Sequence, residues 1–246
     1  MRNVLDEFRR DLESIYSLLD FDQFIIDLPL SEIRALKTYA EEQDLPIVKQ
    51  KAEKLEKILT GIREHGSTKI TYGTIYNQCI VLAVSYFSAA LENLFEYCIE
   101  SSLKAGGSEV LRSEEIKLRV KDICSIGPNP LSQVGEFLVS NNKISFQDMK
   151  SIKRSFKEYL NVDIIKDELT NDIIFAQAAR HIIVHNGSEI NSRFQNQILA
   201  AAPRTIKPEL PYTGKLSFGK EEIIQVGRRM EEYMVLLTEK LSAYQR

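Results

Sequence analysis

The chain has 246 residues, enough for one large domain, and only 11 glycines and 7 prolines, so long helices are favoured over a turn-rich β fold. Its 35 acidic residues against 32 basic ones give a net charge of −3. This balance excludes a protein that coats nucleic acid by bulk positive charge, although a local basic site is compatible with it.

Several classes of protein are disfavoured by what the sequence lacks. The three cysteines have no CxxC spacing, which argues against a disulfide framework or a thiolate metal site. There is no Gly-rich phosphate loop and no GxSxG pattern, so an ATPase or an α/β hydrolase is not expected. The N-terminus is charged, and the longest apolar stretch, 79–91, is shorter than the ~20 residues of a membrane span. We therefore expect a cytoplasmic protein with no membrane contact, no cofactor and no metal.

Apolar residues recur every three or four positions in the first quarter of the chain, as on one face of a helix. The pattern predicts helices over 4–19 and 46–64, with a shorter one over 31–43. We interpret 1–66 as an N-terminal amphipathic helical extension packed on the rest of the protein. A dimerisation arm is the alternative, but each stripe covers only about two heptads.

Residues 67–246 are predicted to form the main helical domain, so the fold class is all-α with about eight to ten helices in total, by the same helical patterns. A turn is expected at 127–130 and a loop over 203–219, which contains three of the prolines. The predicted helices of this domain cover 74–103, 113–124, 131–140, 146–160, 171–185, 189–202 and 220–243.

One segment suggests chemistry: Arg180 and His185 lie in an apolar helix that ends at Asn186-Gly187. An Arg presents a planar fork that matches a phosphate, and a His passes protons near neutral pH. Together they suit cleavage of RNA by its own 2′-hydroxyl, with the Arg stabilising the charge on the phosphate. Positions five apart are about 140° apart on a helix, so the two side chains share a face only if the helix distorts or two copies meet.

Two other interpretations use the same residues. In the structural one, Arg180 pairs with an acid and His185 caps the helix C-terminus, where a cation is favoured. In the metal one, His181 and His185 hold an ion, since their spacing of four allows it. The zinc-protease pattern also requires a Glu beside the first His, where this chain has Ile182, and no third ligand is evident.

The stretch 180–187 resembles the R-x4-6-H motif of the HEPN superfamily (higher eukaryotes and prokaryotes nucleotide-binding), with His181 in the polar position after the Arg and an ending similar to the RiboL-PSP type. The resemblance covers 70–246. It implies a HEPN-like helical bundle over 67–246 that acts as a homodimer and cuts single-stranded RNA without a metal at a cleft shared by two protomers. Arg180 and His185 would be catalytic, with Asn186, His181 and Glu92 in support.

The resemblance also implies partners. Such proteins act in phage defence or as toxins of toxin–antitoxin pairs, so an antitoxin or regulatory protein is expected beside the RNA substrate. Some family members are catalytically silent dimers that bind partners or nucleotides, and this is the alternative function. A weaker RNA contact is a basic stripe, with a solvated helix face as its alternative; its members are Lys150, Lys153, Arg154 and Lys157.

Overall fold

The computed structural model describes residues 1–19, 23–64, 66–126, 130–142, 144–207 and 214–244. About 79% of the chain is helical. No strand occurs in these ranges, and the one β-type contact is an isolated antiparallel bridge between Glu189 and Lys215. The predicted all-α class is therefore confirmed. His65, beside the predicted domain boundary at 66, lies outside the described residues, as do residues 127–129 of the turn predicted at 127–130.

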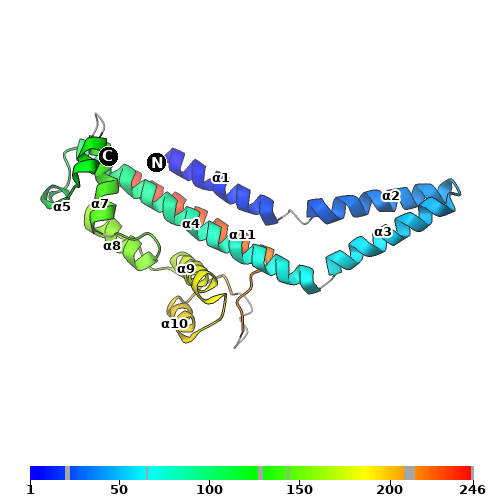
Figure 1. Cartoon of the computed structure of the whole chain (residues 1–246). Helices are drawn as coiled ribbons and strands as arrows, with labels where there is room; N and C mark the ends of the chain where they lie inside the picture. The colour runs from blue at the N-terminus through cyan, green and yellow to red at the C-terminus, as the bar shows by residue number, and fades with distance from the viewer. Residues whose placement is uncertain (20–22, 65, 127–129, 143, 208–213, 245–246) are drawn as a thin grey trace.

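The core is built around α4 (Gly66–Lys104), with α1 (Arg2–Leu19) and α11 (Lys220–Tyr244) alongside it (Figure 1). Phe87 of α4 lies between the two neighbours: its ring centroid is 5.9 Å from that of Phe8 and 5.6 Å from that of Tyr233. Because each helix buries its apolar stripe against the others, the three form one hydrophobic unit.

Within the described residues, α4 is the one helix whose length and composition would suffice to cross a membrane, over Gly73–Lys104. In this fold it is the central helix of the bundle, and 56% of its most apolar window is buried by other parts of the chain. The apolar stretch 79–91 that stands out in the sequence thus belongs to the protein core.

Short elements cover one end of α4: α5 (Glu109–Ser113), α6 (Val120–Ser125), a 3-10 turn at Pro130–Gln133 and α7 (Val134–Asn142). The prediction of one helix over 113–124 is wrong, because the backbone turns extended at Glu114 and stays non-helical to 119. Tertiary contacts hold this stretch: the Asn141 side chain accepts from the Lys117 N–H at 3.2 Å, and Glu114 accepts from the Tyr159 hydroxyl at 3.3 Å.

Three further helices position the candidate site: α8 (Met149–Leu160), α9 (Glu168–Asn186) and α10 (Ser192–Ala200). α9 begins with a capping box between Asp167 and Thr170 and packs against α4, α8, α10 and α11. It ends at Gly187, whose φ of 58° is left-handed, as the Asn-Gly pair predicts. Most of its residues are buried, so its few polar side chains are tightly constrained.

A hairpin of α2 (Leu28–Glu42) and α3 (Pro46–Glu64) projects from the bundle, preceded by a π-helical turn at Gln23–Asp27 (Figure 1). Packing divides the predicted 1–66 extension into two parts. α1 belongs to the main core, where four members of its predicted stripe are buried, whereas the hairpin contributes no residue to that core. The part that stands apart is therefore 28–64.

Candidate functional site

A cavity of about 460 Å³ lies between the N-terminus of α8, the middle of α9 and α10. α9 contributes Gln177, Arg180 and His181 to its wall, together with apolar contacts from Ile174 and Ala178. The positions 174, 177, 178 and 181 recur at helical spacing, so one face of α9 forms one side of the cavity. The other lining residues come from the start of α8 and from α10: Gln147, Asp148, Met149, Lys150, Arg193 and Gln197.

The start of α8 is attached to α9 by a buried amide. The Gln177 Oε1 accepts a hydrogen bond from the Met149 N–H at 3.0 Å, which satisfies one of the unpaired donors of the first helical turn. The Asp148 carboxylate caps the same turn by accepting from the Ser151 N–H at 2.8 Å. These two bonds hold Lys150, which follows directly, at the edge of the cavity.

Two buried donors on this wall have no partner among the described residues. They are Nε2 of Gln177 and Nε of Arg180. A buried donor left unpaired costs about 1–3 kcal/mol, so an acceptor that reached either group would stabilise this wall. Arg180 also forms no ion pair within the described part of the chain, which leaves the structural interpretation of Arg180 without the acid that it requires.

The charge on the lining residues favours an anion. Lys150, Arg180 and Arg193 are permanent cations, and Asp148 is the one carboxylate among the described residues of the wall. That carboxylate is already engaged as the cap of α8. A guanidinium that is half-buried and not neutralised by an acid is well suited to hold a phosphate group.

The two imidazoles of the motif contact each other at the rim. The ring centroids of His181 and His185 are 4.8 Å apart, with 48° between the planes. Burial lowers the pKa of His181 first, and the nearby charges of Arg193, His185 and Arg180 lower it further. A lowered pKa favours the neutral ring, which has a lone pair with which to accept a proton.

The structure separates the two residues predicted to be catalytic. Arg180 lines the cavity, whereas His185 is exposed and is not among its described lining residues. The difference follows from their spacing of five, which turns the side chains to different faces of the helix. His181 lies between them: it lines the cavity and contacts His185.

The other two supporting residues lie outside the cavity. Asn186 is the exposed last residue of α9, and its backbone carbonyl accepts from the Glu189 N–H at 3.0 Å. Glu92 is half-buried on α4 and makes no ion pair with Arg180. Its charge instead acts on Glu96, whose pKa rises to about 6 chiefly through burial and further through the charges of Glu92 and Glu136. Support from Glu92, by orienting Arg180 or the motif His, stays a prediction, and in this structure Glu92 makes no ion pair with Arg180.

The predicted basic stripe on α8 divides between two environments. Lys150 lines the cavity, and Lys153 and Arg154, one turn further on, continue from it along the helix. Lys157 instead pairs with Asp163 at 2.6 Å and lines a different cavity. Three of the four cations therefore remain available to extend a phosphate-binding surface.

Gln177 and Arg193 are lining residues that the sequence reasoning missed. Gln177 has a detectable signal, because it lies three positions before Arg180 and four before His181 and so shares their side of the helix. Arg193 has no local signal. It reaches the cavity from the first turn of α10, whose cap is Asn191.

Comparison with protein-family models, with curated proteins and with solved structures finds no match. In the described ranges, no group of three or more His, Cys, Asp or Glu side chains could hold a metal ion. His181 and His185 therefore have no third protein ligand of these types near them in that part of the chain.

Proposed function

We propose that the chain is a metal-independent endoribonuclease of the HEPN type that cleaves single-stranded RNA at the cavity between α8, α9 and α10. The observation that carries the proposal is the combination, in one wall, of an unneutralised Arg180, two unpaired buried donors and a neutral imidazole. A phosphodiester supplies what this wall lacks, namely negative charge and hydrogen-bond acceptors.

In the proposed reaction, Arg180 and Arg193 hold the phosphate oxygens. His181 accepts the proton of the 2′-hydroxyl, and the 2′-oxygen attacks phosphorus while the bond to the 5′-oxygen breaks. His185 donates a proton to the departing 5′-oxygen. The products are a 2′,3′-cyclic phosphate and a 5′-hydroxyl end. His181 and His185 then carry out the two proton transfers as a contacting pair, instead of His185 acting alone.

The remaining implications of the family resemblance belong to the same proposal. The bundle over 67–246 is taken as a HEPN-like domain, and the active form as a homodimer in which Arg180 and His185 of two copies line a shared cleft. A role in phage defence or in a toxin–antitoxin pair, with an antitoxin or regulatory partner, follows from the resemblance alone.

The proposal is tested by incubating labelled single-stranded RNA with the protein in EDTA. Wild-type protein is expected to cut it, and Arg180→Ala and His185→Ala to reduce the rate about 100-fold or more, the usual effect of losing one group that stabilises a transition state. Lys157→Ala is the matched control, since Lys157 is a cation of α8 that faces Asp163. The unfolding temperatures of all variants should match that of the wild type.

A catalytically silent binding module is the second candidate, and the exposed position of His185 outside the cavity favours it. In that case RNA or nucleotide phosphates bind in the cavity and leave unchanged. Intact RNA in every reaction, together with binding that is lost in Arg180→Ala, would establish this alternative against the nuclease. Intact RNA with a large loss of thermal stability in His185→Ala would instead support a structural role for the motif.

A further inference from the structure

The α2–α3 hairpin exposes an unusual number of large apolar side chains. The most exposed on each helix are Leu28 on α2, at 58% of its full exposure, and Ile47 on α3, at 69%. Single exposed apolar residues are ordinary, but a contiguous group on one projecting element indicates an interaction surface. The large apolar side chains of the two helices that are exposed are Leu28, Leu36, Tyr39, Ile47, Leu55 and Ile58.

The interior of the hairpin is small. Its buried residues among those described are Leu30, Ala40 and Ala52, and none of them belongs to the main core. Two alanines and one leucine bury little apolar area for a hairpin of 37 residues, 28–64. Helices of this length depend for their stability on packing of an apolar face. The hairpin is therefore an element that gains stability when its exposed apolar residues are covered.

The exposed apolar residues form two rows with the same spacing. Leu28, Leu36 and Tyr39 on α2 are repeated by Ile47, Leu55 and Ile58 on α3, and each row spans about 80° of an ideal helix. The middle of the α2 row holds Glu32, and the equivalent place on α3 holds Lys51.

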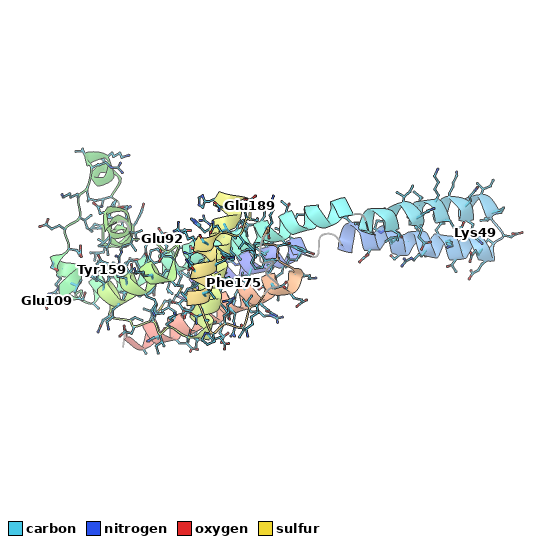
Figure 2. All side chains as sticks on the ribbon, turned by 90° about the horizontal axis from the view of Figure 1, so that it is seen from below. Lys49, Glu92, Glu109, Tyr159, Phe175 and Glu189 are labelled. Atoms are coloured by element: carbon cyan, nitrogen blue, oxygen red, sulfur yellow. The ribbon has the colours of Figure 1, made fainter. Side chains whose placement is uncertain are left out.

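Both rows lie on one face of the hairpin. On each helix, viewed from its N-terminus, the exposed row is rotated away from the buried seam in the same sense. Because the two helices are antiparallel, these rotations bring both rows to the same side of the hairpin. The ion pairs mark the other side: Glu56 accepts from Arg34 at 2.9 Å and from Lys37 at 3.4 Å, and Lys49 pairs with Glu41 at 3.0 Å. Figure 2 shows the hairpin, marked by Lys49, extending well away from the α9 region, marked by Phe175.

We propose that this face binds the same face of a second copy of the chain, so that two hairpins form a four-helix bundle with α2 of each copy over α3 of the other. The exposed charges in and beside the rows are acidic on α2, at Glu32, and basic on α3, at Lys51 and Lys54, whereas α3 over α3 would bring lysines together. Arg34 pairs with Glu56, so these two residues lie at the same level of the hairpin. Glu32 and Lys54 lie two residues on either side of that level, about one helical turn apart along the hairpin. A two-fold axis along the hairpin would therefore bring Glu32 of each copy close to Lys54 of the other. The carboxylate of Glu32 in the middle of the apolar row disfavours insertion into a membrane. This interface uses no residue of the cavity, so it is separate from the cleft that the proposed nuclease would share between two copies, and substitutions in the hairpin test it alone.

The test is sedimentation equilibrium of the full chain over a concentration series, without RNA. Wild-type protein is expected to reach at least twice the chain mass of 28.2 kDa. Leu36→Glu combined with Leu55→Glu, one change in each row, is expected to raise the dimer dissociation constant at least tenfold. The matched control is Thr38→Glu combined with Gln50→Glu, which adds the same charge at exposed positions off the apolar face and should change the constant less than twofold.

Helical content is measured for all three proteins, and since the substituted positions are exposed it should be equal. A wild type that stays monomeric throughout, or three proteins with equal dissociation constants, would overturn the proposal. A monomeric wild type that floats with anionic phospholipid vesicles, and loses this in the Leu36→Glu and Leu55→Glu variant, would identify a membrane as the occupant instead and would equally overturn it.

Discussion

His181 connects the two residues that the motif singles out. It shares the cavity with Arg180 and contacts the ring of His185, and its pKa is lowered by burial and by neighbouring cations. In the proposed reaction this neutral ring is the base, because a protonated imidazole could not accept the proton of the 2′-hydroxyl. Its titration is thus a direct measure of the site.

We predict that the pKa of His181, followed by NMR of the ring protons, lies below the ordinary value of about 6.5. Arg193→Gln should raise it, since the charge of Arg193 is the largest charge effect on the ring. As pH falls, cleavage should be lost when His181 becomes protonated, so Arg193→Gln should move this acid limb to higher pH. Lys157→Gln is the control and should change neither the pKa of His181 nor the acid limb of the pH profile. Equal pKa values for His181 in all three proteins would contradict its assignment as the base.

At the scale of residues, the sequence shows which side chains share a helix but not what faces them. The helical angle alone separates Arg180 from His185 and relates Arg180 and His181 to Gln177. Arg193 reaches the same cavity only because α10 folds back beside α9, and no local pattern encodes that return. Whether Glu92 can orient Arg180 or the motif His likewise depends on how α4 is turned in the core, which no local pattern encodes.

At the scale of elements, α9 is held in place by a buried carboxylate. Asp172 accepts from the Thr205 N–H at 2.8 Å, the Thr205 hydroxyl at 2.5 Å and the Ile206 N–H at 3.0 Å, and it pairs with Arg229 of α11 at 3.1 Å. Its side chain is fully buried. One residue thus attaches α9 to the loop after α10 and to α11, which fixes the helix that carries the cavity wall.

Asp172→Ala should lower the free energy of unfolding by about 3–5 kcal/mol, because it leaves the N–H groups of Thr205 and Ile206 without their acceptor and removes the buried partner of Arg229. Urea denaturation measures the change. Glu232→Ala, which removes the exposed second partner of Arg229, is the control and should cost less than about 1 kcal/mol. A loss below 1 kcal/mol in Asp172→Ala would show that this attachment contributes little.

Helices whose ends are encoded locally are the ones that the sequence predicts well. The end of α9 follows from Asn186-Gly187, and α8 from its cap at Asp148 and its strong apolar stripe. The segment 114–119 has a helical composition yet is not helical, because contacts with Asn141 and Tyr159 override the local preference. Such an override depends on residues 20 or more positions away and cannot be recognised in one sequence.

At the scale of the whole molecule, the net charge of −3 coexists with a local excess of cations at the cavity. RNA would be held at one place and not along the surface. If Lys150, Arg180 and Arg193 each neutralise one phosphate, the logarithm of the RNA binding constant should fall against the logarithm of salt concentration with a slope of about −2. Fluorescence anisotropy with a catalytically impaired His185→Ala protein measures it; a slope of about −6 or steeper would indicate a wider basic surface.

The sequence predicts only in part which of the N-terminal helices join the main core and which project from it. The apolar stripe of α1 resembles that of α3, and nothing in the stripes themselves distinguishes a helix that joins the main core from one that projects. The difference is that the α1 stripe meets α4 and α11, whereas each hairpin helix carries a second, exposed apolar row beside a narrow seam.

The most direct test of the account is cleavage, in EDTA, of a single-stranded RNA compared with the same strand carrying one 2′-deoxy substitution at a mapped cleavage position. We predict that the substituted strand is not cut there, that the unsubstituted strand gives a 2′,3′-cyclic phosphate at that position, and that Arg180→Ala protein cuts neither. Cleavage at the deoxy position, a requirement for added metal, or equal cleavage by the Arg180→Ala protein would contradict it.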